Sequence, residues 1–216
     1  MSDAGFASVI LDVDSTLCGV EGIDWLAERR GGETSARVVE LTDRAMRGDI
    51  ALDAVYGERL ALVRPSRDEV AALADAYAAS LAPQAAYTIL RMRAAGKRIV
   101  LVSGGLREAI LPIAERLGIP ARDVYAVSVR FDADGAYAGF DTKSPLATAT
   151  GKRVVAESLA LPRRIIGVGD GATDLAMRPA VDVFAAYIGF ARRESVVNSA
   201  DVVVSSFDQL MELVLA

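Results

Sequence analysis

Four short apolar runs are spaced along the chain and separated by longer stretches rich in Ala, Leu and Arg. The runs cover residues 8–13, 99–102, 165–168 and 202–204. Each has the length and β-branched composition of a buried strand, whereas the intervening stretches are long enough for helices. Strands that alternate with helices in this way pack as a parallel sheet covered by helices. The pattern therefore predicts an α/β fold with a Rossmann-like parallel sheet.

The interval between the first and second runs is too long for a single helical crossover. Residues 16–96 contain helix-favouring segments but no convincing strand, and a strand-helix-strand unit needs only roughly 30 residues. Gly31-Gly32 marks one helix boundary and residues 47–49 another, and Ser66 followed by Glu69 has the spacing of a capping box. We therefore expect an α/β core formed by residues 1–16 and 81–216, with a helical insertion at residues 17–80.

A second local signal lies after the second predicted strand. Residues 127–140 alternate between apolar and polar positions around Asp134-Gly135. Asp-Gly between alternating segments is a strong β-hairpin signal, because glycine tolerates the positive φ that tight hairpin turns require. This segment is therefore predicted to be a hairpin.

Composition removes several classes of function. The 216 residues include no histidine, which excludes Ser-His-Asp hydrolysis and His-ligated zinc. The 24 basic and 29 acidic residues give a net charge of −5, which disfavours nucleic acid as a partner. The single cysteine cannot form an intrachain disulfide, and the apolar runs are far shorter than a membrane span. With no recognisable secretion signal, a cytoplasmic location is expected.

The first apolar run ends in Asp12-Val13-Asp14-Ser15-Thr16. Alternation along a strand predicts that the carboxylates of Asp12 and Asp14 project from the same face. Open α/β sheets bind ligands at the carboxyl ends of their strands. Taken alone, this short motif fits a polar turn with an N-cap better than a site, so its significance depends on the other strand ends.

The next two strand ends also carry polar, glycine-rich segments. Ser103-Gly104-Gly105 follows the second run and precedes a helix, which is a corner suited to phosphate, although a turn without a ligand fits as well. The third run ends in residues 169–174, where Asp170 and Asp174 offer the oxygen ligands that Mg²⁺ prefers. Lys152, one of only three lysines, opens a helical segment between them. A solvated surface position is the default interpretation of any one lysine, but a compact ammonium also suits a nucleophilic carboxylate beside phosphate.

Other phosphate chemistries do not fit. Residues 167–172 match the dinucleotide pattern G-x-G-x-x-A, but Asp170 would face a pyrophosphate, and no acidic residue follows the strand-like run at residues 183–188. Gly151-Lys152 is followed by an arginine where a P-loop needs Ser or Thr. The sixth residue after Cys18 is an aspartate rather than the arginine that a cysteine phosphatase needs.

Taken in order, these four segments resemble the motifs of the haloacid dehalogenase-like (HAD) superfamily of phosphohydrolases. Further segments are similar to those of its phosphoserine-hydrolysing members, namely Glu21-Gly22-Ile23-Asp24, Arg44-Ala45-Met46, Glu58-Arg59-Leu60-Ala61-Leu62, Pro65-Ser66-Arg67 and residues 136–141. The resemblance covers nearly the whole chain. It implies a HAD-type core with a helical cap, inserted after the first strand, that selects the substrate. It also implies Mg²⁺-dependent hydrolysis of O-phospho-L-serine to L-serine and phosphate through an aspartyl-phosphate, the last step of serine biosynthesis.

The same resemblance implies roles for individual residues. Asp12 would be the nucleophile, Asp14 the general acid and base, and Lys152 the charge-balancing group. Mg²⁺ would be held by Asp12, Asp170 and the backbone carbonyl of Asp14, with support from Asp174. The substrate would be bound by Glu21 through its ammonium, by Arg59 through its carboxylate, by Met46 along its carbon chain, and by Ser103, Gly104 and Thr173 through its phosphate.

Three positions depart from the family pattern. Thr173 stands where many members have Asn, and a hydroxyl can also donate a hydrogen bond to phosphate. Leu52 stands where an aromatic residue is expected, and Arg153 follows Lys152 where glycine is common.

Two other classes of protein fit less well. A phospho-aspartate receiver is nearer half this length and lacks the helical insertion, and a binding module gains nothing from clustered carboxylates that repel one another. Within the superfamily, a phosphatase for another small phosphorylated metabolite, or a phosphotransferase to an acceptor such as homoserine, remains the alternative. The expected partner is a small phosphorylated amino acid, with neither nucleic acid nor membrane involved and with the protein acting as a monomer or homodimer.

Overall fold

The protein is built around a six-stranded parallel sheet. The computed structural model describes residues 5–47, 49–50 and 52–216, and the side chains of Met46, Leu52 and Ala54 also lie outside this description. The strand order is β3-β2-β1-β6-β7-β8, which confirms the predicted α/β class. The strands are β1 (Ser8–Leu11), β2 (Arg98–Leu106), β3 (Val124–Val127), β6 (Ile165–Gly169), β7 (Val183–Tyr187) and β8 (Val202–Val204).

The central strand β1 carries the first site motif. All four of its residues are buried, and Ile10 pairs with Val100 of β2 on one side and with Gly167 of β6 on the other. Parallel strands covered on both faces are apolar throughout, which explains why this run shows no alternation. Asp12 follows directly, and its backbone N–H still donates to the Val168 carbonyl at 3.1 Å. The motif is therefore anchored at the middle of the sheet.

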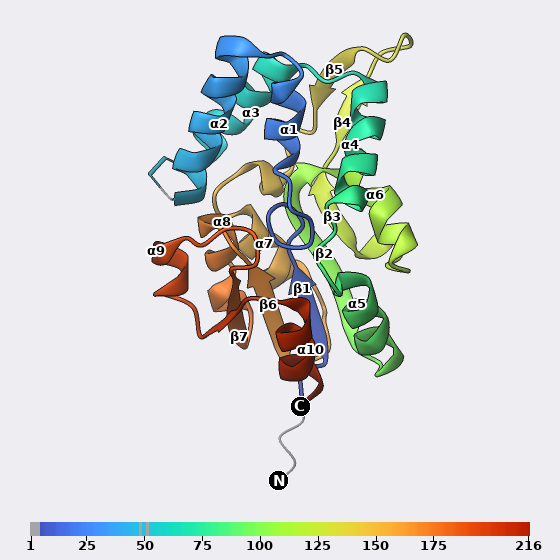
Figure 1. Cartoon of the computed structure of the whole chain (residues 1–216), viewed down its shortest axis with the longest axis vertical. Helices are drawn as coiled ribbons and strands as arrows, with labels where there is room; N and C mark the ends of the chain where they lie inside the picture. The colour runs from blue at the N-terminus through green and yellow to red at the C-terminus, as the bar shows by residue number, and fades with distance from the viewer. Residues whose placement is uncertain (1–4, 48, 51) are drawn as a thin grey trace.

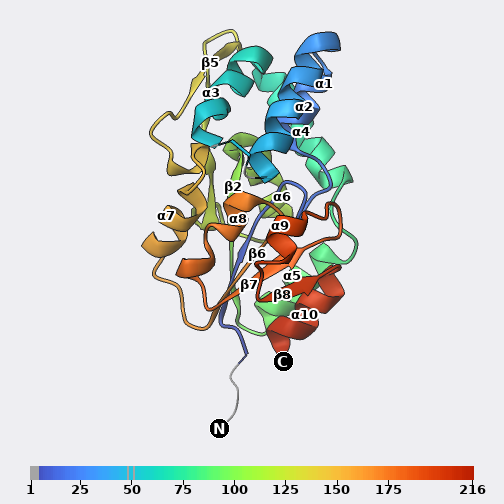
Figure 2. The same cartoon turned by 90° about the vertical axis from the view of Figure 1, so that its left-hand side faces the viewer.

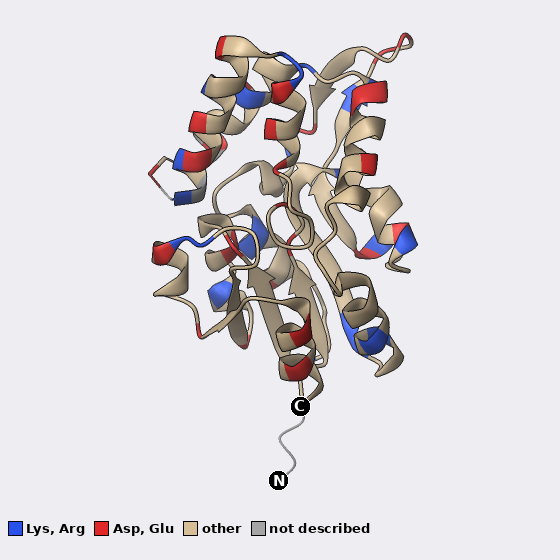
Figure 3. Ribbon diagram, in the orientation of Figure 1, with Lys and Arg blue, Asp and Glu red and all other residues tan. Residues whose placement is uncertain are grey.

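Helices cover both faces of the sheet (Figure 2), with α7 on one side and α5 and α10 on the other. Charged segments gather on the helices and loops, and the strands are almost free of them (Figure 3). The elements around the sheet are α5 (Ala85–Ala94), α6 (Arg107–Arg116), α7 (Gly151–Ser158), α8 (Ala172–Leu175), α9 (Glu194–Val197) and α10 (Phe207–Leu215), with 3-10 turns η1 (Ala121–Asp123), η2 (Pro145–Ala147) and η3 (Arg178–Ala180).

Four helices lie beyond the carboxyl ends of the strands (Figure 1). They are α1 (Gly22–Glu28), α2 (Gly32–Arg47), α3 (Leu52–Val63) and α4 (Arg67–Ala79), and no strand occurs in the described part of this segment. The capping box that begins α4 is present, because Ser66 Oγ accepts from the Glu69 N–H at 3.2 Å and Glu69 Oε2 accepts from the Ser66 N–H at 2.8 Å. These four helices form a layer, called the helical layer below, over the strand ends.

The predicted hairpin is also present and packs beside the helical layer. Its strands β4 (Val129–Phe131) and β5 (Tyr137–Phe140) pair antiparallel, and Gly135 has φ +83° in the turn. The ring of Phe140 lies 5.4 Å from that of Tyr56 in α3, measured between centroids. Figure 1 shows the hairpin at the top of the molecule next to α4.

The strands differ from the sequence predictions at two boundaries by more than one residue, and one strand was not predicted. β1 ends at Leu11 rather than residue 13, and β2 runs on to Leu106 through the Ser-Gly-Gly segment. β2 is extended because Leu106 pairs with Val127 of β3 after a shift in register. β3 itself was not predicted, because Val124–Val127 runs directly into the alternating segment assigned to the hairpin. Among the described residues, no helix is long and apolar enough to cross a membrane.

Candidate active site

Asp12, Lys152 and Asp174 form a buried charged cluster above the sheet. Lys152 Nζ donates to Asp12 Oδ1 at 2.5 Å and to Asp174 Oδ1 at 2.6 Å. Burial alone would lower the pKa of Lys152, but the charges of the two carboxylates outweigh it and raise that pKa. Burial, together with the charge of Asp174, raises the pKa of Asp12. One ammonium thus serves two carboxylates away from water.

Asp170 completes a set of three carboxylates that suits a metal ion. One oxygen each from Asp12, Asp170 and Asp174 lies within 4.8 Å of the others, and all three residues are buried. Asp170 Oδ1 accepts from Thr16 Oγ1 at 3.0 Å, and its Oδ2 forms an ion pair with the guanidinium of Arg193. Three buried carboxylates in an all-oxygen donor set fit a hard divalent cation.

Asp14 is held by donors from three directions. Its Oδ1 accepts from the Gly22 N–H at 2.8 Å and from Tyr77 Oη at 2.6 Å, and its Oδ2 accepts from Ser103 Oγ at 3.3 Å. Burial raises the pKa of Asp14, although the Tyr77 and Gly22 hydrogen bonds oppose that shift. Asp14 is thus oriented by the first and last helices of the helical layer.

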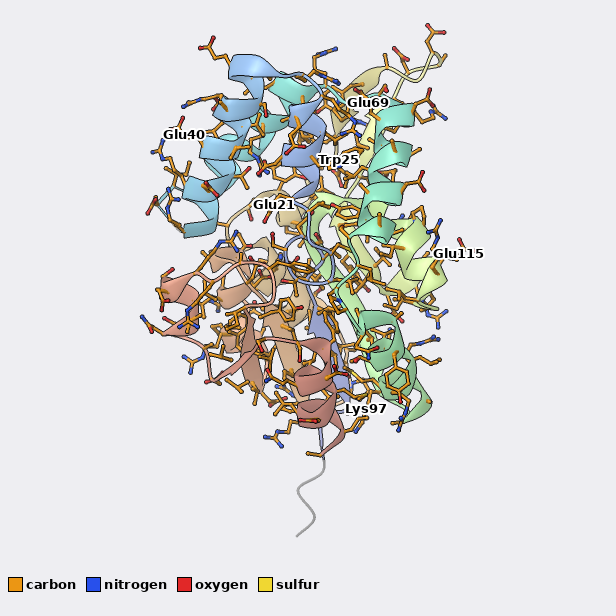
Figure 4. The ribbon with its side chains drawn as sticks, in the orientation of Figure 1. Glu21, Trp25, Glu40, Glu69, Lys97 and Glu115 are labelled. Carbon is orange, nitrogen blue, oxygen red and sulfur yellow. The ribbon has the colours of Figure 1, made fainter. Side chains whose placement is uncertain are left out.

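The helical layer contributes one acidic and one basic side chain on the opposite side of the pocket. Glu21 accepts from Ser15 Oγ at 2.7 Å, and Figure 4 places it where α1 meets the core. Burial and the charge of Asp14 raise the pKa of Glu21 to about 7. Arg59, which is 3% exposed, reaches Asp24 at 3.4 Å, and its Nε donates to no acceptor among the described residues. Arg59 therefore carries an unused, buried N–H.

The five carboxylates described above that belong to Asp12, Asp14, Glu21, Asp170 and Asp174 meet Lys152 and Arg59 in one pocket between the sheet and the helical layer. It is lined by Asp12, Asp14, Glu21, Gly22, Ile23, Tyr56, Arg59, Gly104, Gly105, Leu146, Thr148, Lys152, Asp170, Thr173 and Asp174. The lining includes five acidic residues and two basic ones, Arg59 and Lys152, so a ligand that carries both charges would find partners for each.

The family model for haloacid dehalogenase-like hydrolases matches residues 9–178, a span that contains every element of this pocket. The chain belongs to the haloacid dehalogenase-like hydrolases. The fold expected from the resemblance is thereby confirmed.

Known proteins similar to this haloacid dehalogenase-like hydrolase include several phosphoserine phosphatases. It is 37% identical over 207 residues to phosphoserine phosphatase of Homo sapiens, covering 94% of this chain and 91% of the human one. It is 35% identical to the chloroplastic phosphoserine phosphatase of Arabidopsis thaliana, covering 94% and 70%. A phosphoserine phosphohydrolase-like protein from Francisella tularensis has the same fold, with a TM-score of 0.88, 26% identity and coverage of 96% and 99%.

The structure of this hydrolase brings most of the predicted site residues together. Eight of them line the pocket together with Gly104, namely Asp12, Asp14, Glu21, Arg59, Lys152, Asp170, Thr173 and Asp174. Ser103 is not among the lining residues and is fully buried, and its hydroxyl accepts from the Gly105 N–H at 2.9 Å and donates to Asp14. The side chains of Met46 and Leu52 lie outside the described residues.

One geometric reason given from the sequence was wrong. Strand alternation cannot orient Asp12 and Asp14, because β1 ends at Leu11. Instead Asp12 is fixed by Lys152, and Asp14 by the helical layer. Ser15, which follows, has φ +54° and turns the chain toward α1.

Sequence reasoning missed Tyr56, Tyr77 and Arg193. Tyr56 Oη donates to the Gly104 carbonyl at 2.7 Å, and its spacing of three from Arg59 on α3 is a signal that could have found it. Arg193 follows β7, so the strand-end rule could have found it. Tyr77 sits in an apolar helix face and carries no local signal.

Proposed function

We propose that this hydrolase is a Mg²⁺-dependent phosphoserine phosphatase that releases L-serine and phosphate, the last step of serine biosynthesis. The observation that carries the proposal is the placement of Glu21 and Arg59 in the same pocket as Asp12, Asp14 and Lys152. O-phospho-L-serine bears an ammonium, a carboxylate and a phosphate. Glu21 offers a partner for the ammonium, the free Nε–H of Arg59 a partner for the carboxylate, and Lys152 a positive charge for the phosphate.

The carboxylate set supports a divalent cation in the same pocket. Asp12, Asp170 and Asp174 provide the side-chain oxygens, and the backbone carbonyl of Asp14 is the further ligand that the resemblance implies. When bound, Mg²⁺ supplies positive charge that offsets the phosphate dianion and the carboxylates around it. Side chains of the protein carry out the nucleophilic attack and the proton transfers.

Asp12 attacks phosphorus in line, and the bond between phosphorus and the serine oxygen breaks to leave an aspartyl-phosphate. Lys152, already in contact with Asp12, offsets the negative charge that gathers as the nucleophile approaches. Asp14 donates its proton to the departing serine oxygen and then takes a proton from the water that hydrolyses the intermediate. One carboxyl group serves both half-reactions.

Residues 17–80 act in this proposal as a cap that selects the substrate. Glu21 precedes α1 and Arg59 lies in α3, so both substrate charges are recognised from the helical layer. The chemistry is confined to the strand ends below. This division predicts that changes in Arg59 alter the choice of substrate more than they alter phosphate chemistry.

The test is a phosphate-release screen over phosphorylated amino acids, sugar phosphates and an aryl phosphate, with and without Mg²⁺. We expect O-phospho-L-serine to have the highest kcat/KM. In Arg59→Ala, kcat/KM for O-phospho-L-serine should fall by a factor that corresponds to roughly 2 to 5 kcal/mol of lost transition-state binding, the cost of breaking a buried charged contact. The kcat/KM for the aryl phosphate should change far less. Arg44→Ala, at a half-exposed arginine of α2, is the matched control.

Two outcomes would contradict the proposal. An equal loss of kcat/KM for both substrates in Arg59→Ala would mean that Arg59 supports the fold or binds the phosphate group. Preference for another phosphorylated metabolite, or transfer to an acceptor such as homoserine in place of water, would give the pocket a different substrate.

A further inference from the structure

Tyr77 connects the last helix of the helical layer to the carboxyl group of Asp14. It lies near the end of α4, is fully buried, and donates from Oη to Asp14 Oδ1 at 2.6 Å. No motif of the sequence includes it. Packing alone does not require the Tyr77 hydroxyl, because a phenylalanine would fill the same apolar space without a hydroxyl that needs a hydrogen-bond partner. The hydrogen bond to Asp14 is therefore what distinguishes the tyrosine.

Two glycines leave the space that this hydroxyl occupies. A Cβ at Gly22 would come within 2.3 Å of Tyr77 Oη, and one at Gly105 would come within 3.1 Å of Tyr77 Oη and 2.6 Å of Asp14 Oδ2. Gly22 begins α1, and Gly105 lies in β2. The helices α4 and α1 and the strand β2 thus pack around the carboxyl group of Asp14. α4 and α1 each donate a hydrogen bond to it, and the glycine of β2 leaves room for it.

The two oxygens of Asp14 are held very differently. Oδ1 accepts two short hydrogen bonds, from Tyr77 Oη and from the Gly22 N–H, which occupy both of its in-plane lone pairs. Oδ2 has a single longer contact of 3.3 Å with Ser103 Oγ. Oδ2 is therefore the oxygen left to exchange a proton with a reacting group.

We propose that Tyr77 is a positioning residue for the acid-base work of Asp14, an inference that rests on the proposed function. By fixing Oδ1, Tyr77 directs Oδ2 toward the reacting atoms. The proton leaves Asp14 Oδ2 for the serine oxygen as the phosphorus–oxygen bond breaks. It is replaced from water as the oxygen of that water forms a bond to phosphorus and the aspartyl-phosphate bond breaks. Tyr77 keeps its own proton throughout.

The test compares Tyr77→Phe with the parent on two substrates by rapid quench. An aryl phosphate such as 4-nitrophenyl phosphate releases a phenolate that needs no proton, so formation of the phosphoenzyme no longer depends on Asp14, whereas its hydrolysis still does. We expect the burst of phenolate in Tyr77→Phe to stay within about threefold of the parent, and phosphate release to slow by roughly 10- to 100-fold, so phosphoenzyme accumulates. On O-phospho-L-serine, kcat should fall by at least that factor, with KM within about threefold.

Tyr56→Phe is the matched control, since it removes another buried hydroxyl between the helical layer and the core, but one that donates to the Gly104 carbonyl. We expect it to change the two half-reactions together and to accumulate no phosphoenzyme. If Tyr77→Phe behaves like Tyr56→Phe, or like the parent, the positioning role is wrong. A parent that hydrolyses the aryl phosphate but not O-phospho-L-serine overturns the proposed substrate alone, and a parent that forms no phosphoenzyme overturns both.

Discussion

Lys152 Nζ lies 2.5 Å from Asp12 Oδ1, although 140 residues separate the two in the sequence. The contact joins the N-terminal turn of α7 to the residue that follows β1, and both side chains are buried. A buried ion pair of this kind stabilises little in itself, but removing one partner leaves an uncompensated charge. The pair therefore links the fold and the chemistry of the site.

Lys152→Met should lower both activity and stability. Measured in chelator by urea unfolding, its free energy of unfolding should fall by about 3 to 5 kcal/mol, because the carboxylates of Asp12 and Asp174 lose their shared ammonium. Activity should fall by on the order of 10³-fold or more, as it should in Asp12→Asn, which lacks the nucleophile. Adding Asp12→Asn to Lys152→Met should restore part of the stability and none of the activity. A double variant no more stable than Lys152→Met would disprove this coupling.

Mg²⁺ should stabilise the protein as well as support turnover. At 100 times its dissociation constant, a ligand of the folded state adds about 2.7 kcal/mol, which a thermal shift assay detects without any activity measurement. Asp170→Asn should lose most of this shift, because it removes one of the three buried carboxylates that could hold the ion. Asp208→Asn, at an exposed position of α10, is the control. Full turnover in chelator, or an unchanged shift in Asp170→Asn, would contradict the metal assignment.

The KM for O-phospho-L-serine should depend on pH through Glu21. Burial and the charge of Asp14 raise the pKa of Glu21 to about 7. Recognition of an ammonium needs the carboxylate form, so KM should rise as pH falls below about 7, approaching tenfold for each pH unit. Dividing by the KM for an aryl phosphate cancels titration of the phosphate group. Glu21→Gln should have a high KM for O-phospho-L-serine with no such pH dependence. If the ratio of the two KM values in the parent does not change with pH, Glu21 does not recognise the ammonium.

The same shift has a consequence for stability in the ligand-free protein. The pKa of Glu21 is about 7 in the folded state against an ordinary value of 4.5, so the folded state binds more protons between those values. The free energy of unfolding contributed by Glu21 therefore falls as pH rises from about 4.5 to about 7. Urea unfolding of the parent and of Glu21→Gln between about pH 4.5 and about pH 7 measures this contribution as the difference between their free energies of unfolding.

The capping box at the start of α4 should stabilise the helical layer without touching the chemistry. Ser66→Ala removes the acceptor for the Glu69 N–H and should cost about 1 kcal/mol of unfolding free energy. Glu69 also pairs with Arg30, a contact that lowers the pKa of Glu69 to about 2. Values of kcat and KM should stay at the parent level. Ser35→Ala, inside α2 rather than at an N-cap, is the control, and an equal loss of stability there would exclude the capping effect.

The sequence by itself determined the features that depend on neighbouring residues. The turn at Gly135 and the cap at Ser66 arise from interactions within a few residues, and the run around Ile10 shows its burial by its apolar composition, so these patterns could be read without a structure. The parallel sheet then brings the carboxyl ends of β1, β2 and β6 to one edge. That rule alone placed Asp12, Gly104 and Asp170 around one pocket.

Only the tertiary structure decided how the reacting groups are held. The donor from Tyr77 reaches Asp14 across 63 residues, and the guanidinium of Arg193 reaches Asp170 from the loop after β7. Neither contact follows from a local pattern, because each depends on how a helix or loop packs after the sheet has formed. The raised pKa of Glu21 has the same origin, since burial between the helical layer and the core, rather than its neighbours in sequence, removes its carboxylate from water.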